Sequence, residues 1–165
     1  MLQRNHYERA FEKFLRERKI PYLAVLERYR SSAENGKTIK NFDFVISRPN
    51  KVSYLIDVKG RKFSPGGYWR SWSTRDDLIG LKQWESIFGA KFCGLFVFAY
   101  QICGRVSPLP PEDLFEYQDK LYGFVGISYR DYLSEVKVLS PRWRTFSLPS
   151  VKFRQLARPF LDFVR

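Results

Sequence analysis

The fold of this chain is decided by residues 42–59, which read FDFVISRPNKVSYLIDVK. Phe42, Phe44 and Ile46 alternate with Asp43 and Val45, which is the period-two pattern of a strand. The triplet Arg48-Pro49-Asn50 is typical of a turn. Residues 52–59 then read as a second strand. We therefore predict a β-hairpin over this stretch.

Upstream of the hairpin the sequence predicts a helix. The pattern Asn5-x-x-Glu8 is a capping box that begins a helix, and Ile20-Pro21 ends it. Between these points aromatic and apolar residues recur at helical spacing and form one buried stripe, with Glu8 at its edge: Tyr7, Phe11, Phe14 and Leu15. Residues 22–26 (YLAVL) read as a first strand. The polar segment 31–40 contains the turn signal Asn35-Gly36.

Downstream of the hairpin we expect a loop and then a helical crossover. Residues 60–73 (GRKFSPGGYWRSWS) are too rich in Gly, Pro and Ser for regular structure. The pattern Thr74-x-x-Asp77 caps a helix that runs to about Phe88, where Gly89 is a natural stop. Residues 95–102 are almost wholly apolar, which indicates a central strand covered on both faces. The order α-β-β-β-α-β places the chain in the mixed α/β class.

The remaining sequence predicts shorter elements. After a break over 106–111 we expect a helix near 112–119, a strand near 122–128, a helix from about Arg130, and an amphipathic piece from Ser150 that Pro159 interrupts. No internal repeat or long linker divides the chain. Residues 1–165 are therefore expected to form a single domain, with a core over about 5–102 and a C-terminal extension over about 103–165.

Composition predicts a soluble, folded protein. Of the 165 residues, 44% are apolar and 18% aromatic, which is too many for a disordered chain. No apolar run approaches the ~20 residues of a membrane span, and the first residues lack the apolar segment of a secretory signal. Cys93 and Cys103 lie at the two ends of one predicted strand, too far apart for a disulfide. We therefore expect reduced thiols and a cytoplasmic protein, associated with the nucleoid if the source is bacterial.

Basic residues are concentrated in two segments. The chain carries 29 Lys and Arg against 17 Asp and Glu, a formal charge of +12. Residues 51–75 hold six basic residues against Asp57, and residues 137–165 hold seven against Asp162. Concentrated basicity is the electrostatic pattern of a protein that binds polyphosphates. Because no basic amphipathic helix stands apart from the core, the pattern favours nucleic acid over an anionic membrane.

Three ionisable residues interrupt the two predicted strands: Asp43 in the first, and Asp57 and Lys59 in the second. Asp57 and Lys59 are two residues apart and therefore project from one face. If the strands are neighbours, Asp43 lies beside Asp57, and a divalent cation removes the repulsion between the two carboxylates. Oxygen ligands of this kind suit Mg²⁺. The structural alternative is an internal Asp–Lys pair, with Asp43 only capping a turn.

Asp43, followed fourteen residues later by Asp57-Val58-Lys59, resembles the D…(D/E)-x-K signature of the PD-(D/E)XK nuclease superfamily. That superfamily has a similar order of elements, with a helix, a three-stranded meander, a crossover helix and a further strand. Its branch of archaeal Holliday-junction-resolvase-like proteins adds a glutamate on the first helix and a polar residue, often glutamine, on the second. This sequence has Glu8 and Gln83 at those places. The resemblance implies a restriction-endonuclease-like fold over about residues 5–102.

The same resemblance implies metal-dependent hydrolysis of phosphodiester bonds in DNA. It assigns Mg²⁺ or Mn²⁺ to Asp43, Asp57, the carbonyl of Val58 and Glu8. Lys59 would orient the attacking water or stabilise charge on the phosphate, and Gln83 would help to position either of them. Judged from the residues alone, Glu8 is equally well explained by its cap at Asn5, and Gln83 by an exposed helix position.

The loop after Lys59 is the expected contact with DNA. Its basic residues neutralise phosphates, and its aromatic residues stack on exposed bases. The candidates are Arg61, Lys62, Trp69, Arg70, Trp72 and Arg75. The alternative is that Trp69 and Trp72 pack under the loop as a small satellite core.

Two other functions would use nearly the same residues. One is a catalytically inactive nucleic-acid-binding module of nuclease descent, and the other is an RNA-directed nuclease of the same fold. DNA is the expected partner, no membrane is expected, and a homodimer would allow both strands of a duplex to be cut. The sequence has no GxxxxGK[ST] loop and no elbow-type serine, so it gives no support to nucleotide or serine hydrolysis.

Overall fold

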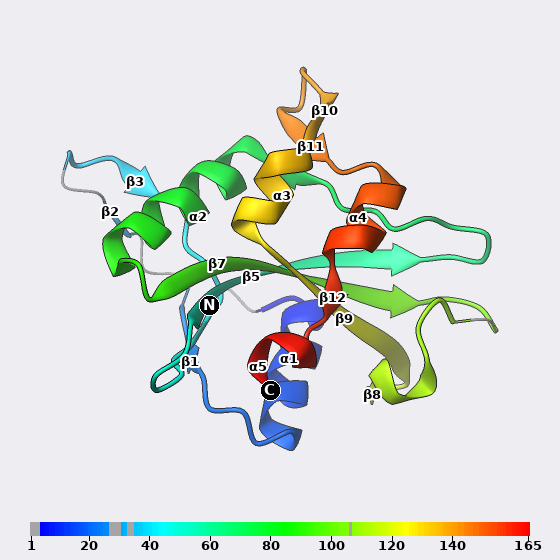
Figure 1. Ribbon diagram of the computed structural model, residues 1–165. Helices are drawn as coiled ribbons and strands as arrows, with labels where there is room; N and C mark the ends of the chain where they lie inside the picture. Colours follow the sequence, from blue (N-terminus) through cyan, green and yellow to red (C-terminus); the bar gives the residue numbers. More distant parts are fainter. Residues whose placement is uncertain (1–3, 27–30, 33–34, 106) are drawn as a thin grey trace.

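The computed structural model (Figure 1) describes residues 4–26, 31–32, 35–105 and 107–165. A seven-stranded sheet forms its centre, in the order β1-β4-β5-β7-β9-β12, with β8 paired to β9 off this path. The long parallel strands β5 (Ser53–Phe63) and β7 (Phe92–Ile102) lie in the middle. Strands β4 (Phe44–Ile46) and β9 (Lys120–Ser128) pair antiparallel on either side of them. The predicted mixed α/β class is confirmed.

Helices cover both faces of this sheet and give it two cores. On one face α1 (His6–Glu17) and α5 (Leu161–Val164) pack against a core that includes Ile56 and Val58 of β5. On the other face lie α2 (Arg75–Phe88), α3 (Tyr129–Glu135) and α4 (Ser150–Leu156), over a core that includes Leu55. Side chains alternate along a strand, so the odd-numbered residues of β5 project toward α2.

The predicted hairpin and both predicted helix starts are confirmed. Strands β4 and β5 pair antiparallel, with Phe44 opposite Ile56. The Asn5 side chain accepts a hydrogen bond from the Glu8 backbone at the start of α1. Thr74 and Asp77 form a reciprocal capping box at the start of α2, because each side chain accepts from the other residue's backbone N–H.

Two segments differ from the sequence prediction. Residues 60–63, predicted as part of a loop, continue β5, because β7 runs on beside them to Ile102 and offers backbone partners. The helix predicted near 112–119 is wrong, since that stretch holds only the 3₁₀ turn Pro111–Asp113 and the strand β8 (Leu114–Tyr117). Gln118 and Asp119 both have positive φ and connect β8 tightly to β9.

The short strands complete the architecture. Of the strand predicted over 22–26, only β1 (Leu23–Ala24) forms, at the edge of the sheet. Strands β2 (Ser31–Ser32) and β3 (Thr38–Ile39) pair across the predicted Asn35-Gly36 turn. A separate three-stranded sheet contains β6 (Ser73–Thr74), β10 (Lys137–Ser140) and β11 (Thr145–Ser147). Strand β12 (Arg158–Pro159) pairs with β9, so residues 103–165 supply strands to the same central sheet.

Two further expectations concern membranes and cysteines. Within the described ranges no helix has the length and apolarity needed to cross a membrane. Cys93 and Cys103 are both free and partly buried, at the two ends of β7.

Candidate active site

A cavity of about 410 Å³ lies where α1, β5 and the start of α2 meet. Most of the candidate residues named from the sequence line it: Glu8, Asp43, Asp57, Val58, Lys59, Arg61 and Trp72. Lys40, Thr74 and Asp77 also line it, although the sequence analysis gave none of them a functional role. The cavity therefore gathers side chains from segments that are far apart in the sequence.

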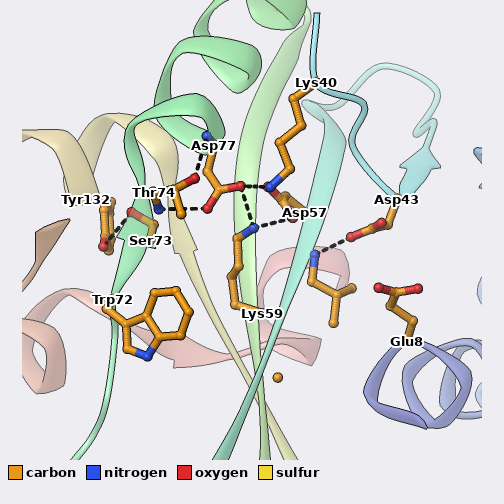
Figure 2. A network of polar contacts seen from close by, with 12 residues as sticks. Glu8, Lys40, Asp43, Asp57, Lys59, Trp72, Ser73, Thr74, Asp77 and Tyr132 are labelled. Atoms are coloured by element: carbon orange, nitrogen blue, oxygen red, sulfur yellow. Dashed lines mark hydrogen bonds and ion pairs between the residues drawn. The ribbon is translucent and has the colours of Figure 1, made fainter. Parts of the chain in front are cut away.

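Asp43 and Asp57 are brought together by the pairing of β4 with β5. Phe44 lies opposite Ile56, and Asp43 precedes Phe44 while Asp57 follows Ile56. The Asp43 backbone N–H donates to the Ile56 carbonyl at 2.7 Å, so Asp43 lies just beyond the regular ladder and close to Asp57. Both are only 6% exposed, and the Asp43 carboxylate accepts a hydrogen bond of 2.7 Å from the backbone N–H of Val58. This contact, drawn in Figure 2, fixes the Asp43 side chain against β5.

Glu8 approaches the same carboxylates from α1. It is buried, and in Figure 2 its carboxylate faces that of Asp43. The side-chain amide of Asn5 also donates to Glu8 Oε1 at 2.7 Å. The capping role and the place beside Asp43 are thus compatible, because one turn of helix supplies both.

Gly60 explains why α1 can come so close to β5. A Cβ atom at this position would lie only 2.0 Å from the ring of Tyr7, which is far inside van der Waals contact. With glycine there, the Tyr7 ring rests directly on the strand backbone. Because Tyr7 precedes Glu8 in α1, this close approach helps to hold Glu8 beside the aspartates.

Lys59 is held by two carboxylates. Its Nζ lies 3.1 Å from Asp57 Oδ1 and 2.8 Å from Asp77 Oδ1, as Figure 2 shows. The Lys40 ammonium also contacts Asp77 Oδ1. The other oxygen of Asp77, Oδ2, accepts from the backbone N–H of Thr74 at 2.8 Å. Asp77 therefore caps α2 with one oxygen and binds two lysines with the other.

Burial and like charge act together on the two aspartates. Burial raises the pKa of Asp43 well above its ordinary value, and the nearby charges of Asp57 and Glu8 raise it further. Burial also raises the pKa of Asp57, although Lys59 partly offsets the effect. Loss of water favours the neutral form of a carboxyl group, and neighbouring carboxylates do the same. A cation beside this pair would relieve both effects.

In the Lys59–Asp77 pair, attraction between opposite charges outweighs burial and favours the charged form of both groups. Burial alone would lower the pKa of Lys59, but Asp57 and Asp77 outweigh it and raise that pKa. Burial alone would raise the pKa of Asp77, but Lys59 and Lys40 outweigh it and hold that pKa below its usual range. Both partners are therefore charged at neutral pH, and Lys59 is a hydrogen-bond donor rather than a base.

Arg61 and Trp72 form a stacked pair at the cavity. The guanidinium carbon of Arg61 lies 3.7 Å from the centre of the Trp72 ring, and its Nη1 donates to the Gly60 carbonyl at 2.6 Å. Burial lowers the pKa of Arg61. Among the described residues, the buried Nε of Arg61 has no hydrogen-bond partner.

The other predicted DNA contacts lie outside the cavity. The ring of Trp69 packs among Phe63, Tyr100 and Phe153, in agreement with the satellite-core alternative. Three predicted contacts, Lys62, Arg70 and Arg75, are exposed and do not line the cavity. Of the two predicted stacking residues, only Trp72 is therefore at the cavity.

Gln83 is half-buried on α2 and does not line the described cavity. It lies six residues after Asp77, which at 100° per residue turns it to a different face of the helix. Asp77 is the α2 residue that reaches Lys59 instead. The only sequence pattern that included Asp77 was Thr74-x-x-Asp77, and we interpreted it as a helix cap alone.

The donor atoms fit a hard divalent cation. Mg²⁺ takes oxygen ligands and is commonly held by one or two carboxylates together with waters and substrate phosphates. Asp43 and Asp57 supply two carboxylates on adjacent strands. Across the residues that the structure describes, no group of three or more His, Cys, Asp or Glu side chains is arranged so that it could hold a metal ion. A cation here would therefore depend on water, backbone or substrate oxygens as well.

Comparison with known proteins identifies a fold. The chain is similar to Hjc of Archaeoglobus fulgidus, a Holliday junction resolvase from an archaeal hyperthermophile, with a TM-score of 0.53 and 13% sequence identity. The match covers 93% of this chain and 96% of that chain, so it extends beyond residues 5–102. It confirms the predicted restriction-endonuclease-like fold. No family model matches the sequence, and no curated protein matches it.

Proposed function

We propose that this protein is a metal-dependent endonuclease that hydrolyses phosphodiester bonds in DNA. The observation that carries the proposal is the convergence of buried Asp43, Asp57 and Lys59 at one cavity, from two adjacent strands. Burying charged groups is costly, and two neighbouring carboxylates add repulsion to that cost. Such an arrangement is better explained by chemistry than by packing.

Four residues would hold the cation, Mg²⁺ or Mn²⁺. Asp43 and Asp57 are the principal ligands in this proposal, and Glu8 and the carbonyl of Val58 are the additional ones. A bound divalent cation polarises a phosphoryl oxygen and lowers the pKa of bound water. The role of the protein is to keep these oxygens together, through the hydrogen bond from Val58 N–H and the close approach of α1 at Gly60.

Lys59 would stabilise negative charge on the phosphate. Its raised pKa keeps the amine protonated, so Lys59 can donate hydrogen bonds to phosphate oxygens or to the attacking water. Asp77 would act as a positioning residue, because it retains Lys59 whenever Asp57 is engaged by a cation. Gln83 has no place in this arrangement that the geometry supports.

Arg61 and Trp72 would bind the substrate next to the reacting phosphate. Arg61 offers its positive charge at the cavity, and Trp72 offers part of its ring surface there. The exposed residues Lys62, Arg70 and Arg75 would extend the contact to neighbouring phosphates. A homodimer would present two such cavities to the two strands of a duplex, which sedimentation with and without DNA would reveal.

The proposal is tested by incubating labelled DNA and RNA oligonucleotides with the protein in Mg²⁺, Mn²⁺ or EDTA. We expect cleavage of DNA by the wild type with either metal, none in EDTA, and none by Asp43→Asn. Asp76→Asn, the same substitution at an exposed aspartate that does not line the cavity, is the control and should cleave normally. Cleavage of RNA alone would favour the RNA-directed alternative. Binding without cleavage under every condition would favour the inactive module.

A further inference from the structure

A β-hairpin outside the candidate active site presents an exposed tryptophan. We call it the Trp143 hairpin, and it comprises β10, the turn over residues 141–144 and β11. In Figure 1 it is the orange segment that projects beyond the rest of the molecule. The side chain of Trp143 is 71% exposed. This hairpin belongs to the basic segment 137–165, which the proposed active site does not use.

The basic residues of that segment differ in whether they form ion pairs. Outside the hairpin, Lys152 pairs with Glu135 and Arg165 with Asp162, while Arg154 and Arg158 have no ion pair among the described residues. Within the hairpin, the three basic residues have no ion pair in the part of the chain that the structure describes: Lys137, Arg142 and Arg144. Three of the five basic residues of this segment without an ion pair therefore lie in the hairpin with the exposed tryptophan.

The turn holds Trp143 in a defined place. The Trp143 backbone N–H donates to the Ser140 hydroxyl at 3.3 Å, and Arg144 closes the turn with a φ of 50°. The guanidinium carbon of Arg142 lies 5.3 Å from the centre of the Trp143 ring. A large apolar ring left in water forgoes the favourable free energy of burial. A ring and cations displayed together in an ordered turn match the components of a nucleic-acid stacking site.

The hairpin is joined directly to the candidate active site. Strand β11 pairs with β6, with Thr145 opposite Thr74. The backbone N–H of Arg75, the first residue of α2, donates to the Arg144 carbonyl at 2.9 Å. Thr74 and Trp72 both line the cavity that holds Lys59. Paired strands lie about 4.8 Å apart, so the hairpin begins one strand away from the cavity.

We propose that the Trp143 hairpin binds an unpaired nucleotide of DNA beside the cleaved bond. The Trp143 ring would stack on the base, while Arg142 and Arg144 would contact the flanking phosphates. The proposal rests on the proposed function for its place beside the cleaved bond. It deepens that function by naming the substrate class as DNA with a single-stranded segment or unpaired bases.

A second copy of the chain is the competing occupant, because Val138 and Leu139 are also exposed on the hairpin. In a two-fold dimer the same patch meets itself. Lys137, Arg142 and Arg144 of each copy would then face the like charges of the other, which is unfavourable. The charge of the hairpin therefore favours a polyanion.

The test measures binding in EDTA, where cleavage does not interfere. Fluorescence anisotropy would compare a single-stranded oligonucleotide, a duplex with one bulged base and a fully paired duplex. The variants are Trp143→Ala, Trp143→Phe, which keeps an aromatic ring, and Leu139→Ala as a control on the same hairpin. Trp143 is largely exposed, so its truncation removes little buried surface. Thermal unfolding would verify that each variant folds.

We expect Trp143→Ala to weaken binding of the single-stranded and bulged DNA by about 5- to 150-fold, the range for losing one stacked base. Trp143→Phe should lose less, and Leu139→Ala and the paired duplex should change little. Equal affinity of Trp143→Ala and wild type for all three ligands would overturn the inference, and so would a wild-type dimer that Trp143→Ala converts to monomer. If the wild type binds as expected but cleaves nothing, the proposed function fails and the binding site stands.

Discussion

Asp77 offers the sharpest test of the lysine network, through the substitution Asp77→Asn. Asparagine keeps the shape and an oxygen that can accept from Thr74, but it removes the negative charge between Lys59 and Lys40. Lys40 is 44% exposed and can turn to water, so its contact is worth little. Lys59 is buried and loses one charged hydrogen bond, worth about 1.5–3 kcal/mol. We expect the free energy of unfolding to fall by about that amount, which lowers Tm by about 3–12 °C.

The stability difference between wild type and Asp77→Asn should depend on pH, in a direction that follows from the pKa of Asp77. Burial tends to raise the pKa of Asp77, but Lys59 and Lys40 outweigh it and keep that pKa below its ordinary value of 3.8. The unfolded chain therefore takes up this proton at a higher pH than the folded protein does. The stabilisation from Asp77 is present above the ordinary pKa and is lost as the pH falls toward the folded pKa. The difference between wild type and Asp77→Asn should shrink over that acidic range.

Urea unfolding followed by tryptophan fluorescence would measure both proteins at pH 7 and at several values between pH 5 and pH 3. Asp76→Asn is the matched control, because Asp76 is exposed and lies next to Asp77 in the same helical turn. Equal stability of Asp77→Asn and wild type at pH 7 would refute the reasoning. A stability difference that stayed constant down to pH 3 would refute the assignment of the effect to the carboxylate charge.

Three more predictions concern the acids and the tryptophans. Asp43→Asn should abolish cleavage yet stabilise the fold by about 0.5–2 kcal/mol, because burial, Asp57 and Glu8 raise the pKa of Asp43 and the charged acid therefore costs stability above its ordinary pKa. Thermal unfolding at pH 5 and pH 8 should show that the gain in stability grows with pH, and a loss of stability would contradict this prediction. Mg²⁺ at 100 times its Kd should stabilise the wild type by about 2.7 kcal/mol in scanning fluorimetry but leave Asp57→Asn unaffected, whereas an equal shift in both would place the metal elsewhere. Trp69→Ala should lower the free energy of unfolding in urea by about 3–5 kcal/mol, while Trp72→Ala should lower it by about 1 kcal/mol and mainly weaken DNA binding. A larger loss of stability for Trp72→Ala than for Trp69→Ala would contradict the core position of Trp69 and the cavity position of Trp72.

The elements that local patterns determine were predictable. The alternation over residues 42–46 and the turn at 48–50 are enough to specify β4, β5 and their pairing. The capping pattern Thr74-x-x-Asp77 located the start of α2. The spacing of Asp57 and Lys59 predicted that both project from one face, and the structure places their charged atoms 3.1 Å apart.

What the sequence did not reveal depends on contacts between distant segments. Residues 60–63 extend β5 because β7 provides a partner, and local composition carries no signal for that. Residues 114–117 form β8 because Phe115 packs against Phe14 and Phe124 beside a tight turn. The position of the Asp77 oxygen that contacts Lys59 depends on where α2 crosses the sheet, which the capping pattern does not specify.

The distribution of charge within the cavity predicts which side would bind a metal and which side would bind a phosphate. Glu8 and Asp43 lie on the side of β5 nearest to α1, and Figure 2 shows them apart from the Lys59–Asp77 pair. Lys59 and Arg61 are two residues apart, so both project toward α2, where the helix N-terminus adds further positive potential. We infer that a metal cation would bind on the acidic side and a phosphate on the basic side. Asp57 lies between the two sides, because its charge acts on Asp43 and its carboxylate contacts Lys59 on its own strand. Its substitution should therefore disturb metal binding and phosphate binding together.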